Sequence, residues 1–111
     1  MPEITYIFIK EALGGTIIKL AVCEVLYLHS MGNYVKIICD WNKNYLIHTS
    51  LRKFLKGLPA ARLCRIHQSH VINIDRILTV NGNMVTLENG LELKIGSNFR
   101  KGFLEMLVVQ G

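Results

Sequence analysis

Short runs of alternating apolar and polar residues fill the first half of the chain and predict β-strands. The runs are rich in β-branched and aromatic residues, and glycine or asparagine stands between several of them. The expected strands cover residues 5–9, 16–20, 25–29, 34–39 and 44–49. Gly14-Gly15 predicts a hairpin between the first two strands, and residues 21–24 are expected to form a brief turn or one helical turn.

The pattern changes to a helical period over residues 50–58. Its apolar positions are Leu51, Phe54, Leu55 and Leu58, and its basic positions are Arg52, Lys53 and Lys56. Thr49 or Ser50 is a suitable N-cap, and Gly57 with Pro59 is expected to end the helix. At least part of the basic face is expected to be an ordinary solvated helix surface.

Three further strands are expected over residues 76–80, 84–87 and 91–95. Asn81-Gly82-Asn83 and Asn89-Gly90 separate them, and Asn-Gly turns between alternating strands indicate a three-stranded meander. After Gly96, Ser97 is expected to cap a final helix. The chain is therefore predicted to be mostly β: an elongated arrangement of small antiparallel sheets with a short helix in mid-chain and a C-terminal helix.

The composition is that of one folded domain over residues 1–111. Apolar residues make up 50% of the chain and charged residues 19%, which excludes disorder. No apolar run approaches the roughly 18 residues of a membrane span, and the N-terminus lacks the features of a signal peptide. We therefore expect a cytoplasmic protein with no membrane partner. Cys23, Cys39 and Cys64 are expected to be buried free thiols.

The net charge of +5 and the pI of about 9.3 favour a polyanionic partner. Residues 30–76 contain eight basic and two acidic residues, a net charge of +6, so this part of the chain carries all of the excess. The basic residues are Lys36, Lys43, Arg52, Lys53, Lys56, Arg62, Arg65 and Arg76, and the acidic residues are Asp40 and Asp75.

Residues 64–73, with the sequence CRIHQSHVIN, interrupt both periodic patterns. Five of the six positions 65–70 carry hydrogen-bonding side chains, which are costly to bury and unsuited to a core. Guanidinium, amide and hydroxyl groups of this kind contact phosphates and base edges. The alternative is a polar loop that only ties a helix to a sheet.

Tyr34 follows Gly32-Asn33 and precedes Lys36 by two positions. A loop tip with these side chains can contact sugar and phosphate. An equally good interpretation is a core tyrosine at the start of a strand. The other three tyrosines are expected to be core or sheet-face residues, and His29 and His48 are expected to be structural.

Catalytic and metal-binding patterns are weak. The chain has no nucleophile-elbow, P-loop or dinucleotide-binding motif, so we expect no enzyme and no cofactor. Cys64-x2-His67-x2-His70 could supply three metal ligands, but a structural zinc site needs a fourth, which would have to be a distant residue such as His29 or His48. Residues three apart in a strand also point to opposite faces. We therefore expect no metal.

The order of the motifs EVLYLHS, GNYVKI, SLRKFLKGLP and RIHQSHVIN, followed by the Asn-Gly meander and a short helix, resembles a LytTR-type DNA-binding domain. Such domains are the output domains of many bacterial response regulators. The resemblance spans roughly residues 8–107, and its most specific part is the arginine-x-histidine-x-serine segment that begins at Arg65 and ends at Asn73. The Gly32-Asn33-Tyr34-Val35 turn is a second, weaker match.

The resemblance implies sequence-specific binding of double-stranded DNA, with loops rather than a recognition helix in the major groove. It places the contacts in three segments. The first is 31–34 with Lys36, the second is the central segment, and the third is the turn after the last strand. The expected DNA-binding residues are Asn33, Tyr34, Lys36, Arg65, His67, Gln68, Ser69, Ser97, Asn98, Arg100 and Lys101.

Three positions depart from the family pattern. A basic residue is frequent where Ser97 stands, so the third contact is expected to be weaker or to shift to Arg100. Gln68 replaces a residue that is often Arg or Asn, which keeps amide readout but changes the preferred base. His70 stands in place of an aromatic residue and is therefore expected to pack rather than to contact DNA.

Response regulators also carry a phosphoacceptor receiver domain, for which this chain has no room. The chain is therefore expected to be a lone domain, a fragment of a longer regulator, or a domain that works with a receiver domain or sensor kinase partner. Family members often bind paired direct repeats, which implies a second copy alongside. Two other classes are a small β protein-interaction module and an RNA or single-strand binder, which the low aromatic content of 8% makes least favoured.

Overall fold

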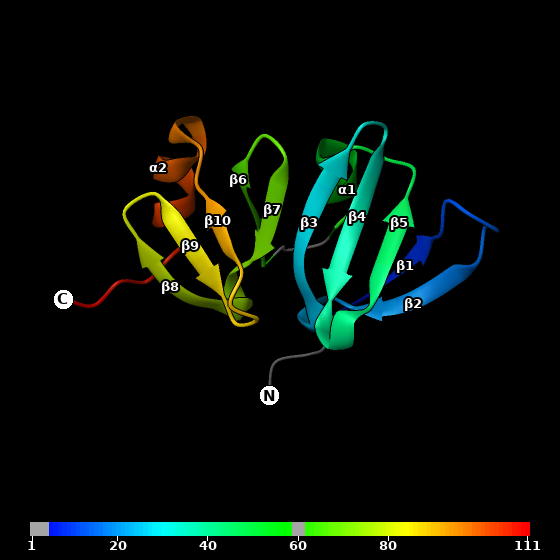
Figure 1. Ribbon diagram of the computed structural model, residues 1–111, viewed down its shortest axis with the longest axis horizontal. Helices are drawn as coiled ribbons and strands as arrows, with labels where there is room; N and C mark the ends of the chain where they lie inside the picture. Colours follow the sequence, from blue (N-terminus) through cyan, green and yellow to red (C-terminus); the bar gives the residue numbers. More distant parts are fainter. Residues whose placement is uncertain (1–4, 59–61) are drawn as a thin grey trace.

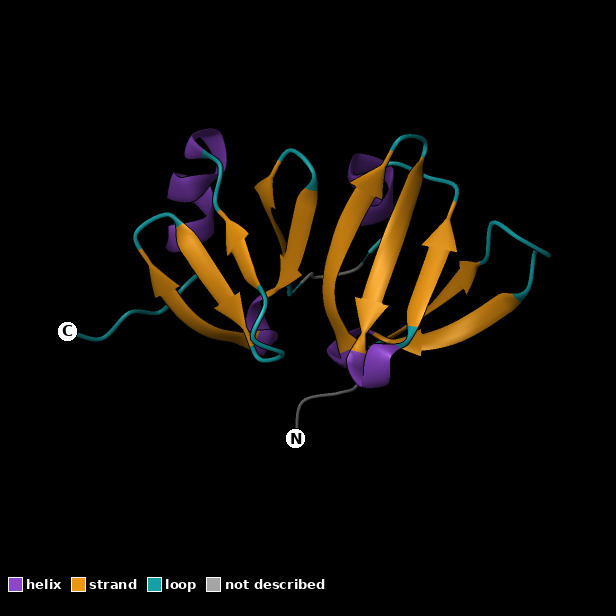
Figure 2. Ribbon diagram, viewed as in Figure 1, coloured by secondary structure: helices purple, strands orange, loops and turns teal. Residues whose placement is uncertain are grey.

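The computed structural model describes residues 5–58 and 62–111 and contains three small antiparallel sheets with two α-helices (Figure 1). The strands are β1 (Tyr6–Lys10), β2 (Ile17–Ala21), β3 (Val25–Met31), β4 (Tyr34–Cys39), β5 (Asn44–Ile47), β6 (Leu63–His67), β7 (His70–Asn73), β8 (Ile77–Asn81), β9 (Met84–Leu87) and β10 (Glu92–Lys94). The helices are α1 (Leu51–Lys56) and α2 (Ser97–Glu105), with short 3-10 helices η1 (Val22–Glu24), η2 (Asp40–Asn42) and η3 (Ile74–Arg76). Strands predominate throughout (Figure 2), as the sequence predicts.

The largest sheet has five strands in the order β5-β4-β3-β7-β6. Its middle strand, β3, pairs with β4 on one side and with β7 on the other. On β3, His29 lies opposite Lys36 of β4 on one side and opposite His70 of β7 on the other. The β1–β2 hairpin flanks this sheet, and the β8–β10 meander forms a separate sheet in the order β10-β9-β8. The elongated arrangement of small sheets is therefore confirmed.

Two hydrophobic cores meet at the β6–β7 hairpin. Val71 belongs to the core beneath the five-stranded sheet and α1, whereas the next residue, Ile72, belongs to the core beneath the meander and α2. Both side chains are fully buried. Since consecutive residues of a strand face opposite sides, the hairpin lies between the two cores. A segment held on both faces is well suited to present a turn in a fixed position.

Asn73 is the buried polar residue of the described chain, with 1% of its surface exposed. Its Nδ2 donates to the carbonyl oxygens of Val22 and Val25, at 3.2 and 2.9 Å, and its Oδ1 accepts from the backbone N–H of Asp75 at 3.0 Å. These bonds compensate the burial of the amide and fasten the end of β7 to the start of β3. The asparagine that ends the central motif is therefore a structural residue.

Several expectations for individual segments need correction. Residues 64–73 form most of a β-hairpin, with only Gln68 and Ser69 in the turn, rather than a polar loop. The N-cap of α2 is Gly96, and Ser97 is the first helical residue. In α1 the predicted cap is confirmed, because Ser50 Oγ accepts from the N–H of Lys53 at 3.1 Å. The expected helix stop at Gly57 also holds, whereas Pro59 lies outside the described residues.

The cysteines also differ from expectation in one case. Cys39 and Cys64 are buried free thiols, as predicted, but Cys23 is exposed in η1. Burial, with help from the nearby carboxylates Glu24 and Asp40, raises the pKa of Cys39 to about 11. None of the described helices is long and apolar enough to cross a membrane.

Candidate nucleic-acid interface

Three chain reversals lie side by side along one edge of the molecule, at the top of Figure 1. They are the β3–β4 turn (residues 31–34), the β6–β7 turn (67–70) and the β10–α2 junction (95–98), and together we name them the turn edge. Backbone bonds connect them. Ser30 N donates to Ser69 O at 2.9 Å, and Gly96 N donates to Ile66 O at 2.7 Å. The three segments that the sequence predicted as contacts are thus brought together.

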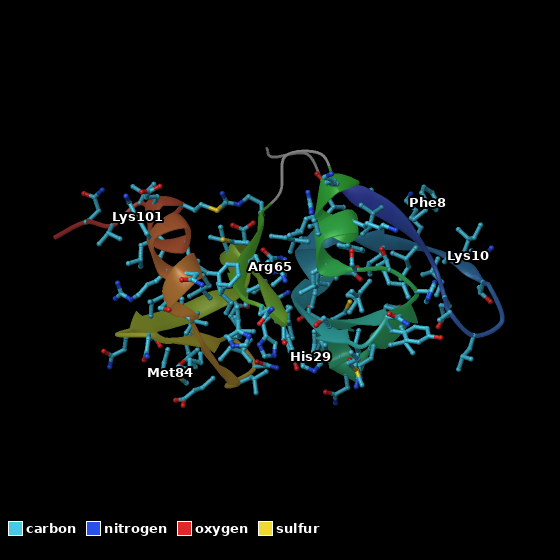
Figure 3. All side chains as sticks on the ribbon, turned by 90° about the horizontal axis from the view of Figure 1, so that it is seen from above. Phe8, Lys10, His29, Arg65, Met84 and Lys101 are labelled. Carbon is cyan, nitrogen blue, oxygen red and sulfur yellow. The ribbon has the colours of Figure 1, made fainter. Side chains whose placement is uncertain are left out.

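The central turn is held from within by Arg65. Its Nη2 donates to the carbonyl of Gln68 at 2.6 Å and its Nε donates to the carbonyl of His67 at 3.3 Å. The guanidinium lies 5.6 Å from the ring centroid of Phe99 on α2, within the range of a cation–π contact. Figure 3 places Arg65 near the middle of the view onto this edge. Arg65, one of the expected DNA-binding residues, therefore has its guanidinium engaged with the turn itself.

Gln68 and Ser69 form the tip of the hairpin, where Gln68 is exposed and Ser69 is half-buried. The backbone N–H of Ser69 donates to Nδ1 of His67 at 3.1 Å. Because Nδ1 accepts, the proton of a neutral His67 resides on Nε2, which can donate to a ligand. Gln68 is therefore open to solvent, whereas His67 is half-buried.

A row of side chains crosses four strands directly below the tips, and we name Lys36, His29, His70 and His67 the histidine row. His29 Nδ1 lies 3.0 Å from His70 Nε2, and the two rings stack with centroids 4.8 Å apart. His67 and His70 are directly paired in the hairpin, with ring centroids 5.5 Å apart. Burial, together with the neighbouring imidazoles of His29 and His67, lowers the pKa of His70 below its ordinary value. His70 packs inside the row, as the sequence predicted.

The first turn presents two of its predicted residues to solvent. Asn33 is exposed, and Tyr34 has 40% of its surface exposed at the start of β4. Tyr34 is therefore a tip residue and not a core tyrosine. Its ring meets that of His48 edge-on at 5.2 Å, so His48 is an exposed neighbour of the turn rather than a buried structural histidine. Lys36 lies lower, on the sheet face within the histidine row.

The third segment carries Ser97, Asn98, Arg100 and Lys101, all of which are exposed. Arg100, however, donates from Nε and Nη2 to the carbonyl of Gly82, at 3.3 and 3.0 Å. Gly96 permits the close packing here, since a Cβ on it would lie 3.1 Å from the ring of Phe99 and 3.6 Å from that of His67. The junction is therefore packed directly against the central hairpin.

Charge is segregated between the two ends of the sheets. The segments 29–36, 65–70 and 94–101, which form the turn edge and its surroundings, contain no aspartate or glutamate. The opposite end of the sheets holds the short helices η1, η2 and η3, at the bottom of Figure 2. These helices contain Glu24, Asp40 and Asp75. Arg76 donates there to Asp40, at 2.6 and 2.7 Å, and to Glu88 at 2.8 Å. Hydrogen bonding to Arg76 lowers the pKa of Asp40.

The basic middle of the chain is accordingly less uniform than its composition suggests. Arg76 is neutralised by Asp40 and Glu88, and Arg62 pairs with Asp75 at 2.7 Å. Lys36 and Arg65, by contrast, lie at or below the turn edge. Sequence reasoning could not separate these two groups, because the ion pairs join residues distant in the chain.

The Cys64-x2-His67-x2-His70 segment does not bring its three side chains together.

 Cys64 packs into the core beneath the meander, and burial raises the pKa of its thiol. His67 and His70, in contrast, lie side by side, because the hairpin pairs them directly. The expectation that all three side chains point apart is therefore wrong for the two histidines. Within residues 5–58 and 62–111, no group of three histidine, cysteine or acidic side chains is arranged to hold a metal ion.

One residue of this region was not predicted from the sequence. His29 was expected to be structural, yet it adjoins the β3–β4 turn and joins it to His70. Met31, in the first predicted segment, has 48% of its surface exposed at the tip of β3. An alternating strand pattern shows which residues share a face, but it does not show which strand becomes the neighbour of β3.

Comparison with known proteins agrees with this geometry. The family model of the LytTr DNA-binding domain matches residues 15–108 of the chain. Among solved structures, the chain is similar to the LytTr DNA-binding domain assigned to a methyl-accepting/DNA response regulator from Bacillus cereus. That match has a TM-score of 0.78 and 18% sequence identity, and it covers 95% of this chain and 98% of the other.

Proposed function

The chain belongs to the LytTr DNA-binding domain family, and from this membership we propose that it binds double-stranded DNA sequence-specifically, with its turns in the major groove. The observation that carries the proposal is the turn edge. Three turns are linked by backbone hydrogen bonds on an edge whose segments contain no acidic residue. An edge of this charge can approach a polyanion without repulsion.

The central turn is the proposed base-reading element. Gln68 is exposed at its tip, and an amide can form a bidentate pair with the N6 and N7 atoms of adenine. Arg65 donates to the carbonyl of His67 and to the carbonyl of Gln68 itself. Since the strands that carry the turn are packed between two cores, its backbone loses little freedom on binding, which favours affinity.

The flanking turns are proposed to position the domain. Asn33 and Tyr34 on one side, and Ser97 and Asn98 on the other, can contact sugar and phosphate oxygens. Lys36 and Lys101 are proposed to neutralise phosphates, and His67 can donate from Nε2. Arg65 and Arg100 act in this scheme through the turns that they hold.

The similar domain from Bacillus cereus also bears on the cellular role of this chain. The similar domain from Bacillus cereus is assigned to a response regulator, and we propose that this chain is likewise the single output domain of a bacterial two-component regulator. Its partners would then be a receiver domain or sensor kinase and, on paired direct repeats, a second copy of the chain. No single-stranded nucleic acid is required by this scheme.

A selection experiment tests the proposal. A pool of random 40-base-pair duplexes is enriched on the purified chain, and affinity for the selected duplex is measured by gel shift with random duplex or single strands as competitor. We expect the selected duplex to bind at least a hundredfold more tightly than random duplex at physiological salt. Equal competition by random duplex would contradict sequence specificity, and preferential competition by single strands would contradict duplex binding.

A second candidate function, a protein-interaction module, draws on a different observation. Val108 and Val109 in the C-terminal tail have 89% and 72% of their surfaces exposed, and Leu78 on β8 has 63%. Exposed apolar residues of this kind favour protein contacts when they are contiguous. Concentration-dependent association that is lost in the Val108→Ser/Val109→Ser variant, with no duplex bound, would favour this function over DNA binding.

A further inference from the structure

The turn between β8 and β9, residues 81–83, is fixed to the turn edge although the sequence did not suggest it as part of the interface. The N–H of Ile95 donates to the carbonyl of Asn83 at 2.7 Å. Arg100 donates twice to the carbonyl of Gly82, which has a φ of +61° that favours glycine. Together with the bonds of the turn edge, these bonds form a continuous series. It connects the β8–β9 turn to the β10–α2 junction, then to the β6–β7 turn and finally to the β3–β4 turn.

The side chains of this turn are open to a ligand. Asn81 and Asn83 are exposed, and neither side-chain amide takes part in a hydrogen bond in the part of the chain that the structure describes. Each amide offers both a donor and an acceptor. No acidic residue lies between Arg76 and Glu88, so the turn itself carries no negative charge.

The size of the molecule determines what such a turn can reach. The longest dimension is 47 Å, and in Figure 1 this axis is horizontal, with the β8–β9 turn toward one end and the β3–β4 turn toward the other. A B-DNA major groove is about 12 Å wide, and one helical turn is about 34–36 Å long. The row of turns spans only part of this axis, because the β1–β2 hairpin lies beyond it at one end and the C-terminal tail at the other. The β8–β9 turn is the outer member of the row, so with the central turn in the groove it is the member nearest to the flanking sugar-phosphate backbone.

We propose that residues 81–83 contact the sugar-phosphate backbone of DNA that flanks the bases read by the central turn. Arg100 is a positioning residue that holds this turn in place, rather than a phosphate contact of its own. The inference rests on the proposed function and adds a fourth segment to the interface. Because amides contact phosphates without neutralising them, the contribution of this turn is independent of base sequence and nearly independent of salt.

The test uses the Asn81→Ala/Asn83→Ala variant and the selected 40-base-pair duplex. We expect a fivefold to thirtyfold loss of affinity, of the size expected for about two hydrogen bonds, and the same loss on random duplex. The hydroxyl-radical footprint should shorten at one end only. Asn44→Ala is the matched control, since Asn44 is an exposed asparagine at the start of β5, and it should change neither the affinity nor the footprint.

Arg100→Lys separates the positioning role from a direct contact. Lysine keeps the charge but not the fork that holds the Gly82 carbonyl, so we expect the footprint to shorten as in the double variant. Asn81→Asp serves as a second variant should the double variant fold poorly, and its added charge should weaken binding further. An unchanged footprint in the folded variants, with wild-type protein binding, overturns this inference alone. Failure of the wild-type chain to bind any duplex overturns the proposed function and this inference with it.

Discussion

His29 Nδ1 lies 3.0 Å from His70 Nε2, so one imidazole donates to the other across β3 and β7. The bond needs at least one neutral ring, because two imidazolium rings have no acceptor to share. It joins the β3–β4 turn to the β6–β7 turn immediately below the tips. The geometry of the candidate interface is therefore coupled to the protonation of this pair.

The first prediction concerns the pH dependence of stability. Burial lowers the pKa of His70, and the neighbouring His29 and His67 lower it further. Near the ordinary histidine pKa, the unfolded state therefore binds a proton more readily than the folded state. The stabilising contribution of neutral His70 is complete above the unfolded pKa of about 6.5 and is lost as the pH falls below it. The free energy of unfolding, measured by urea denaturation, should thus rise between pH 5.5 and 7.5.

The His70→Gln variant should have a smaller rise over the same range. Tyr27 is a titratable group next to the row, and burial raises its pKa further above this interval. His48→Gln, at an exposed position, is the matched control and should keep the wild-type slope. An identical slope in His70→Gln would show that His70 is not responsible.

The second prediction concerns base reading by Gln68. Gln68→Ala should relax the preference at one base position at a cost of about 1–3 kcal/mol, because the exposed amide is the proposed bidentate partner of an adenine. The measurement is a competition assay with the selected duplex and its single-base variants. Gln110→Ala in the C-terminal tail, the other glutamine of the chain, is the control. Equal losses on selected and random DNA would rule out base reading by Gln68.

The third prediction distinguishes turn-holding arginine from phosphate-binding lysine. Arg65→Ala removes two donors from the carbonyls of the central turn, and hydrogen bonds from a charged group are worth about 1.5–3 kcal/mol. The melting temperature should therefore fall, and specific binding should weaken more than binding to random duplex. Lys101→Ala should leave the melting temperature unchanged and reduce the salt slope by about one. The reverse result would make Arg65 a phosphate contact.

The fourth prediction concerns the ion pair that links η2 to η3. Asp40→Asn should destabilise the fold by about 1–3 kcal/mol, because the half-buried Arg76 would lose its bidentate partner. Asp75→Asn removes the exposed Arg62 pair and should cost at most about 1 kcal/mol. Both values come from urea denaturation at pH 7. Equal costs in the two variants would contradict the special role of Asp40.

Acid pH should reproduce the Asp40 effect in the wild-type chain. Hydrogen bonding to Arg76 lowers the pKa of Asp40, so its contribution is present above the ordinary carboxyl pKa of about 3.9 and is lost as the pH falls through the lowered value. The Asp40→Asn variant should lose less stability than wild type between pH 5 and pH 2. DNA affinity at pH 7 should be unchanged, because Asp40 is at the end opposite the turn edge.

The fifth prediction is that the fold does not require a metal ion. Cys64 faces a core with its thiol pKa raised, and Nδ1 of His67 already accepts a backbone hydrogen bond. The melting temperature should therefore be unaffected by EDTA, and protein purified without a histidine tag should contain no stoichiometric zinc. One equivalent of zinc, lost together with the cooperative melt, would be incompatible with this prediction.

Local patterns predicted most of the secondary structure. The Asn-Gly turns of the meander, the alternating strands and the helical period from Leu51 each depend on neighbouring residues, and each is confirmed. The central hairpin was harder to predict. Val71, Ile72 and Asn73 are all buried, because the strand lies between two cores, and alternation disappears in a strand that is buried on both faces.

The candidate site was predictable in part, for a similar reason. The polar tip at Gln68 is visible in the sequence, as is its resemblance to a DNA-binding family. The bonds that assemble the turn edge are not visible, since they join Ser30 to Ser69 and Ile66 to Gly96. The hydrogen bonds from Arg65 and Arg100 to carbonyl groups also depend on the path of the backbone. The sequence therefore could not distinguish an arginine that holds a turn from one that is free to bind phosphate.

The separation of charge described for the two ends of the sheets has a consequence for the encounter with DNA. Carboxylates at one end and an acid-free edge at the other give the molecule an electric dipole, which experiences a torque in the field of a polyanion. The torque turns the acid-free edge toward the duplex within about a Debye length, roughly 8–10 Å at physiological salt. A larger share of collisions then begins in a productive orientation, and the association rate depends on the distribution of charge as well as on its total.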